Sequence, residues 1–274
     1  MSLPDNIRIA ALDGDLHDLA RFLDEQPQHV NSIVVDSSFE ISHMTFLEYS
    51  VTTCREEDMV PVVQLLLARG ARVNSDRADS VPALHRALHL GTSSPYIIPL
   101  VRLLLAAGAN VDRLHNDFTP LGLMIALMGQ SLDGTEWEPR RDIFVALLRA
   151  GASLESAETQ LIFDNGTSAT AVSFLDEVRR TDPSLRNNEE FFEVRALLAG
   201  VREDGSWKSY ARRPHRSILR LRSLYARGRA TLAREQRRKP RGADARRDRA
   251  ILFLVKLGDN GVLWNVLSFW RATD

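Results

Sequence analysis

The stretch L-L-L-A-R-G-A-R-V-N, residues 65–74, returns at residues 103–112 as L-L-L-A-A-G-A-N-V-D. A third copy at residues 147–155 reads L-L-R-A-G-A-S-L-E. Each copy combines an apolar helix end, a glycine, and alternating apolar and polar residues that follow the helix. Glycine suits this position because it adopts the left-handed conformation of a helix C-terminus without steric cost. The recurrence predicts a chain of repeated modules, with the leucine triplets buried between neighbours.

A second phrase precedes each copy and marks the start of a helix. It reads Thr45-Phe46-Leu47-Glu48 in one module, Pro82-Ala83-Leu84-His85-Arg86-Ala87 in the next, and Thr119-Pro120-Leu121 in the third. A threonine caps the first turn of a helix, and a proline fits within that turn. Each module is therefore predicted to contain a helix, a turn, a second helix, a Gly-Ala step and an extended segment, here called the finger.

These two phrases, in this order, resemble the ankyrin repeat, whose pattern is T-P-L-H-x-A followed by a second helix that ends in G-A-D-V-N. The resemblance implies an all-α solenoid of helix pairs with a concave, protein-binding face, and a histidine at position 85 that hydrogen-bonds the backbone between modules. The modules are placed at residues 5–40, 41–78, 79–115, 116–160 and 161–200. The stretches between paired helices are longer than in the ankyrin pattern, and we expect them to be surface loops.

Partner recognition is assigned to the fingers, because their side chains vary between copies while the helix positions vary less. The expected contact residues are Asp76, Arg77, Asp79, Arg113, His115, Asn116 and Asp117. Trp137, in the longest loop between paired helices, is a candidate exposed anchor, since tryptophan is enriched at binding hot spots.

The net charge of −1 hides a strong asymmetry. Residues 1–206 contain 17 Lys/Arg and 31 Asp/Glu, whereas residues 207–249 contain 16 Lys/Arg and 3 Asp/Glu. The acidic repeats favour a basic partner protein. The single cysteine, Cys54, excludes a disulfide framework, and we find neither a secretory leader nor an apolar run that would span a bilayer. A cytoplasmic location, or a nuclear one, is expected.

The basic segment, residues 201–247, is predicted to form a helix from Pro214 and then a linker. Four interpretations remain open: the helix covers the last repeat, residues 237–241 form a nuclear-import signal, the segment binds nucleic acid or an anionic surface, or it belongs to a ligase-binding box. Nucleic acid is the weaker expectation because no aromatic residues interleave with the charges.

Residues 248–274 are predicted to form an apolar helical hairpin. The hairpin either caps the last repeat or recruits a second protein. It resembles the first helix of an F-box, and also the second half of a SOCS box, which follows ankyrin repeats in one family of ubiquitin-ligase adaptors. Under that resemblance the ligase contacts are Leu224, Leu232, Leu257, Leu263, Trp264 and Leu267. The sequence departs from the family patterns at two positions. Gly228 stands where the SOCS-box pattern has cysteine, and Gly258 stands where both box patterns have proline.

The sequence lacks the motifs of an enzyme. It contains no phosphate-binding G-x-x-x-x-G-K-[ST] loop and no G-x-S-x-G elbow. His85 and His89 have the spacing of metal ligands on a helix, but no third ligand is evident. Cys54 is expected to be buried and inert. We therefore expect no catalysis, cofactor or metal, and three hypotheses remain: a protein-binding scaffold, a ubiquitin-ligase adaptor, and a binder of anionic surfaces or nucleic acid.

Overall fold

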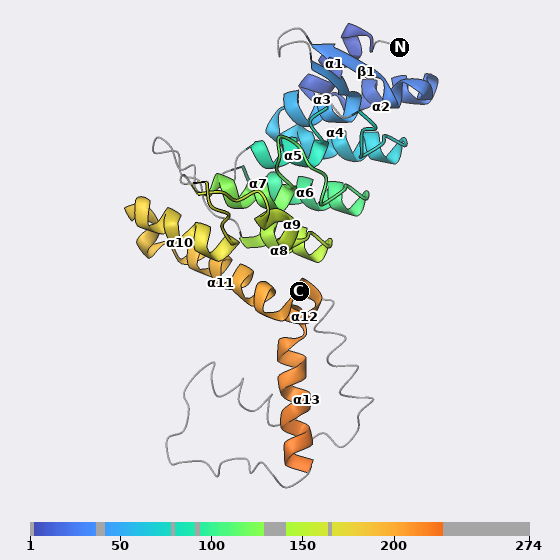
Figure 1. The fold of residues 1–274 in the computed structure, drawn as a ribbon. Coiled ribbons are helices and arrows are strands. Elements are labelled where there is room, and N and C mark those ends of the chain that lie inside the picture. The colour runs from blue at the N-terminus through green and yellow to red at the C-terminus, as the bar shows by residue number, and fades with distance from the viewer. Residues whose placement is uncertain are drawn as a thin grey trace. The chain divides into compact units, whose positions relative to one another are not determined.

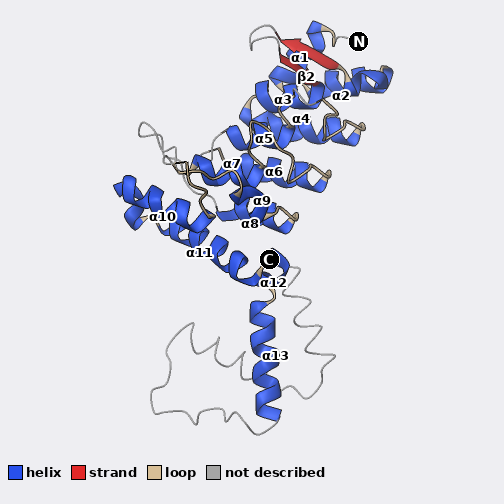
Figure 2. Cartoon of the chain, viewed as in Figure 1, coloured by secondary structure: helices blue, strands red, loops and turns tan. Residues whose placement is uncertain are grey.

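The chain is mostly helical over the residues that the computed structural model describes, as predicted, with one short pair of strands among them (Figure 2). The described residues are 3–36, 42–77, 80–90, 94–128, 141–163 and 166–226. The chain divides into two units, Met1–Trp207 and Lys208–Asp274, which are treated separately below.

Helices of the first unit pack in pairs along the chain. The first members of the pairs are α1 (Asp5–Asp13), α3 (Phe46–Thr53), α5 (Ala83–His89), α7 (Pro120–Leu127) and α10 (Ala171–Thr181). The second members are α2 (Leu16–Glu25), α4 (Glu56–Ala68), α6 (Ile97–Ala106), α8 (Arg141–Arg149) and α11 (Glu189–Asp204).

Neighbouring pairs contact one another in sequence order, so the pairs form a row. Helix α3 packs between α1 and α5, and α5 packs against α7. The second helices follow in parallel, with α4 between α2 and α6, and α8 between α6 and α11. Figure 1 shows α2, α4, α6 and α8 along one side of this row and α1, α3, α5 and α7 along the other. The paired helices therefore contact both their own partner and the helices of neighbouring pairs.

A short helix that was not predicted lies between the last two pairs along the chain. Helix α9 (Leu154–Glu158) contacts α7, α10 and α11. Ser153 caps α9 by accepting a hydrogen bond from the Ser156 backbone N–H at 3.1 Å. Two short 3₁₀ helices, η1 (Pro27–Asn31) and η2 (Pro183–Asn187), follow α2 and α10.

The first finger is a β-hairpin. Strand β1 (Ile33–Asp36) pairs antiparallel with β2 (Ser42–Thr45), in a register that places Ile33 opposite Thr45 and Val35 opposite His43. Val34 and Met44 lie opposite each other and are both buried. The strands therefore present one face to the core and the other outward.

The three copies of the repeated phrase end their helices in the same way. Gly70, Gly108 and Gly151 have φ values of 90°, 87° and 104°, as the glycine argument predicts. In each copy the glycine N–H and the following alanine N–H donate back to carbonyls of the last helical turn, the alanine bonds accepted by Leu66, Leu104 and Leu147 at 3.0 Å. This pattern of two hydrogen bonds is a Schellman motif. The three leucines that accept these bonds are fully buried.

The prediction for the leucine triplets holds only in part. In the first two triplets the middle leucine is fully buried, but the flanking leucines are half-buried. A helix turns by about 100° per residue, so three consecutive side chains cannot all point into one seam.

Threonines cap the helices that begin several modules. The side chain of Thr45 accepts from the Glu48 N–H at 3.2 Å, and the Glu48 carboxylate accepts from the Thr45 N–H at 2.8 Å. This reciprocal pair is a capping box. Glu48 is buried, and its carboxylate also accepts from the Ser80 hydroxyl at 2.7 Å, which joins the second module to the third. Thr119 caps α7 through the Gly122 N–H.

The second unit contains α13 (Arg213–Ala226), within the basic segment, while α12 (Trp207–Ala211) spans the boundary. Leu224 lies in α13. The other residues of the predicted ligase box, Leu232, Leu257, Leu263, Trp264 and Leu267, lie outside the described residues, as does the predicted C-terminal hairpin. Within the part of the chain that the structure describes, no helix is long and apolar enough to cross a bilayer.

Candidate functional site in the fingers

Four fingers lie on the first unit: finger 1 (31–45), finger 2 (71–82), finger 3 (109–119) and finger 4 (152–170). An asparagine near the start of a finger fixes the turn of the next one. The Asn74 amide donates to the Gly108 carbonyl at 2.9 Å and accepts from the Asn110 N–H at 2.9 Å. Asn31 makes the same two bonds one module earlier, to Gly70 and Arg72.

Aspartate stands at the equivalent place in finger 3. Asp112 accepts from the Ser153 N–H at 2.9 Å. An ionised carboxylate has no donor, so it reproduces only the accepting half of the asparagine bridge. These three bridges join the first four modules in sequence order and hold the bases of fingers 2, 3 and 4 in register.

Replacing Asn74 should show what one bridge contributes. We expect Asn74→Ala to lower the free energy of unfolding by about 1–2 kcal/mol, because two hydrogen bonds are lost and each is worth about 0.5–1.5 kcal/mol. Asn74→Asp keeps the acceptor and should cost less. Urea unfolding of the full chain measures both. Equal stability of Asn74→Ala and wild type would contradict the bridging role.

Arg113 ties finger 3 to finger 2. Its guanidinium donates to the backbone carbonyl of Ser75 and, at 2.5 Å, to that of Arg77. The side chain is half-buried. Arg113, predicted as a partner contact, therefore positions the preceding finger.

Finger 3 ends in a tight hairpin turn. His115 and Phe118 exchange backbone hydrogen bonds at 3.0 Å in both directions. The two residues between them, Asn116 and Asp117, have φ values of 47° and 64°. Positive φ at both central positions defines a hairpin turn that asparagine and aspartate tolerate better than other side chains. Both side chains are exposed, so the structure places these two predicted residues at the tip.

His85, on α5, holds this hairpin turn through a hydrogen bond to its backbone. Its Nε2 lies 3.0 Å from the Phe118 carbonyl oxygen, the bond between modules that the resemblance implied. A carbonyl only accepts, so Nε2 carries the proton and donates. Burial lowers the pKa of His85 to about 4, and the neighbouring His115 adds to the lowering. The two rings meet edge to face, with centroids 5.6 Å apart. His115 is thus half-buried beneath the tip.

Three fingers each expose one large aliphatic side chain. Val35 on finger 1, Leu114 on finger 3 and Ile162 on finger 4 are 49%, 60% and 57% exposed. Val35 and Ile162 hold equivalent places, because each pairs with the residue two positions before the next capping threonine, His43 or Ser168. Our sequence reasoning selected only polar finger residues and missed these three. For Val35 and Ile162, the outward positions of short stretches with β-branched residues were the available signal, whereas Leu114 stands among polar residues without such a signal.

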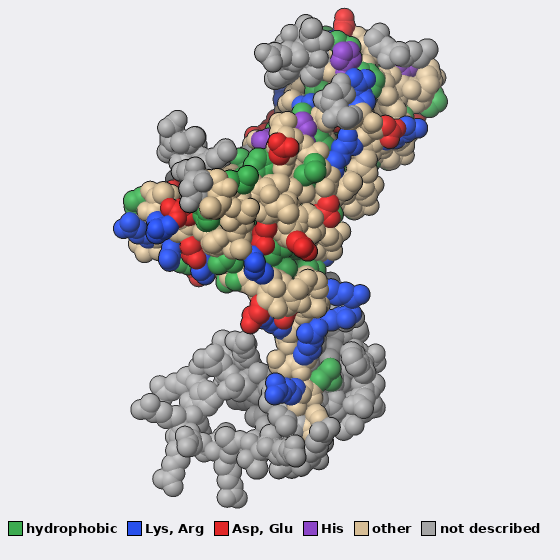
Figure 3. All heavy atoms as spheres, in the orientation of Figure 1, with side chains coloured by type: hydrophobic (Ala, Val, Ile, Leu, Met, Phe, Trp, Pro, Cys, Tyr) green, Lys and Arg blue, Asp and Glu red, His purple; other side chains and the backbone are tan. Residues whose placement is uncertain are grey.

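The other predicted contacts are exposed, half-buried or outside the described residues. Asp76 is exposed and pairs with Arg72 at 3.1 Å. Arg77 is half-buried, and its carbonyl is held by Arg113. Asp79 and Trp137 lie outside the described residues. Figure 3 shows acidic and basic side chains interspersed over the stack and histidines over its N-terminal half.

The single cysteine of the chain lies in an environment that disfavours its thiolate. Cys54 is buried as predicted, and its thiol donates to the Ala11 carbonyl at 2.6 Å. Burial raises the pKa of Cys54 to about 12, so the thiolate, which is the reactive form, is not populated near neutral pH. Among the described residues, no group of three or more histidine, cysteine or acidic side chains is arranged to hold a metal ion.

No protein-family model matches the chain, and no curated protein matches its sequence. Function is therefore inferred from the geometry of the fingers and from the helix rows that carry them.

Proposed function

We propose that Met1–Trp207 is an ankyrin-type solenoid whose fingers and concave face bind a partner protein without catalysis. The observation that carries this proposal is the contrast between fixed finger bases and exposed finger tips, both of which are present in fingers 3 and 4. Bridges from Asn31, Asn74 and Asp112 fix the bases of fingers 2, 3 and 4, while Val35, Leu114 and Ile162 stand exposed near the tips of fingers 1, 3 and 4. Aliphatic side chains on a fixed backbone suit recognition, because little conformational entropy is lost on binding.

The chemistry of the tips indicates a protein partner. Each aliphatic residue stands near polar or charged groups, such as Asn116 and Asp117 beside Leu114. An apolar centre with a polar rim is the usual composition of a protein interface. The excess of acidic residues in residues 1–206 favours a basic partner, whose association should slow as salt is added. A cytoplasmic or nuclear location belongs to the same proposal.

The ligase-adaptor and anionic-surface hypotheses depend on residues 207–274. Most of these lie outside the described residues, and no contact within α13 favours either hypothesis. Both therefore stay predictions.

A matched pair of isoleucines tests the finger proposal. Ile162 on finger 4 and Ile9 on α1 are both 57% exposed. After affinity purification of the full chain identifies a bound protein, we expect Ile162→Ser and Leu114→Ser each to weaken its Kd about tenfold, the effect of losing about 1.4 kcal/mol at a hot spot. Ile9→Ser should leave the Kd unchanged. Calorimetric titration measures all three.

Stability must stay constant for this comparison. Substitutions at exposed sites change the free energy of unfolding by about 0.5 kcal/mol or less, which urea unfolding of each variant verifies. Finger variants that bind the partner as tightly as Ile9→Ser would refute recognition by the fingers.

A further inference from the structure

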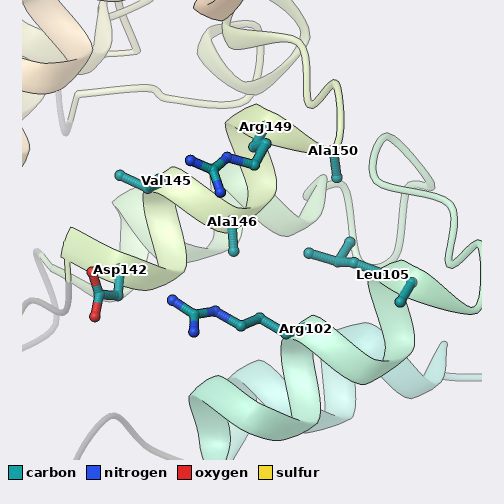
Figure 4. A pocket seen from close by; sticks show the side chains of 8 residues that line it. Arg102, Leu105, Asp142, Val145, Ala146, Arg149 and Ala150 are labelled. Carbon is teal, nitrogen blue, oxygen red and sulfur yellow. The ribbon is translucent and has the colours of Figure 1, made fainter. Parts of the chain in front are cut away.

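A groove opens between α6 and α8, on the second-helix side of the row. Its volume is about 290 Å³. The floor is aliphatic, with Leu105 from α6 and Val145 and Ala146 from α8. Arg102 and Arg149 stand at the rim, one from each helix, with Ala146 between them in the view of Figure 4.

Comparison with the first helix pairs shows how the residues at this groove differ from those between α2 and α4. Between α2 and α4, the equivalent space is bridged by Asp24 and Arg69, which form two hydrogen bonds of 2.9 and 3.2 Å. Arg69 directly precedes Gly70, and Ala150 directly precedes Gly151. Asp24 stands seven residues before Asn31, and Leu105 stands seven before Asp112. The bridging pair is thus replaced by a leucine and an alanine.

Charge on the groove is unbalanced toward positive. The guanidiniums of Arg102 and Arg149 are exposed and form no ion pair or hydrogen bond within the described part of the chain. A single carboxylate, Asp142, lines the same groove. By contrast, residues 1–206 as a whole carry far more acidic than basic side chains. The groove is therefore a local cationic site with an apolar floor on an acidic unit.

We propose that this groove docks an acidic peptide segment of a partner protein, with an aliphatic side chain on the floor and carboxylates on Arg102 and Arg149. The planar guanidinium matches a carboxylate with two parallel hydrogen bonds, and an aliphatic residue covers Leu105 and Val145. The site is separate from the fingers and does not depend on the function proposed for them.

A displayed library of short peptides tests the proposal on the full chain. The library combines Asp or Glu at some positions with Leu, Ile, Val or Phe at others, and a matched library replaces the acidic residues with Lys. We expect enrichment from the acidic library alone. Enriched peptides should bind the Arg102→Glu/Arg149→Glu variant at least about tenfold more weakly in fluorescence anisotropy, the effect of losing charge-assisted hydrogen bonds. Arg186→Glu, an exposed charge reversal on η2, should change nothing.

A second variant closes the groove while keeping both arginines. Leu105→Asp/Ala150→Arg installs the counterpart of the Asp24–Arg69 bridge and should abolish binding of the same peptides. If Leu105→Asp/Ala150→Arg folds poorly, the single change Arg149→Glu, at an exposed position, replaces it as the test. The proposal is overturned if no acidic peptide is enriched, or if enriched peptides bind wild type and Arg102→Glu/Arg149→Glu equally.

Discussion

Leu104→Ala should lower the free energy of unfolding by about 2–5 kcal/mol, the largest effect that we expect from one substitution in this chain. Leu104 is fully buried in α6, within the row formed by α4, α6 and α8, and its carbonyl accepts the Ala109 N–H of the Schellman motif. Truncation removes apolar contacts and leaves a cavity between close-packed helices. Urea unfolding at fixed pH measures the loss.

Leu105→Ala provides the control for this measurement. Leu105 is adjacent, belongs to the same triplet and is only half-buried, so its truncation should cost clearly less. If the two variants lost equal stability, the buried and outward positions of the triplet would have been assigned incorrectly.

Acidification should destabilise the first unit through His85. The pKa of His85 is lowered in the folded state to about 4, first by burial, against an ordinary value of 6.5. The unfolded chain therefore binds more protons than the folded chain between these two values, and stability falls as the pH drops through this window. From the size of the shift we expect a loss of about 2 kcal/mol between pH 7 and pH 5.

The hydrogen bonds of His85 also predict that its protonation destabilises the folded state. Nε2 already donates to Phe118, so a second proton must reside on Nδ1, which is buried and has no acceptor among the described residues. His89 and His115 also have lowered pKa values, chiefly because of burial, so each adds to the loss in the same direction.

His85→Gln isolates the contribution of His85. A glutamine amide also donates a hydrogen bond but does not titrate near neutral pH. The difference in the free energy of unfolding between pH 7 and pH 5 should shrink by about 2 kcal/mol in this variant, as measured by urea unfolding at each pH. An unchanged pH dependence would show that His85 does not titrate as its burial requires.

The local features of this fold were predictable from the sequence. Glycine at 70, 108 and 151 specified left-handed helix ends, and threonine at 45 and 119 specified helix starts, because these preferences depend on a few adjacent residues. Helix α9 also carried a local signal, the capping Ser153, which our sequence reasoning did not use.

Contacts between modules were much harder to predict. Arg113 was assigned to partner binding because finger side chains vary between the copies of the repeat, whereas its guanidinium donates to the backbone of Ser75, 38 positions earlier. Backbone carbonyls are present at every residue, so no side-chain pattern marks the one that accepts. The groove between α6 and α8 was likewise not predicted, since its shape and lining depend on how two helices from different modules pack.

The hydrogen bonds from Arg113 to the backbone of finger 2 couple fingers 2 and 3 to each other. A protein that touches both meets a surface whose spacing is set before contact, so it need not restrain two independent loops. Under the proposed function, Arg113 would contribute to recognition indirectly, by preorganising the loops that carry the exposed side chains.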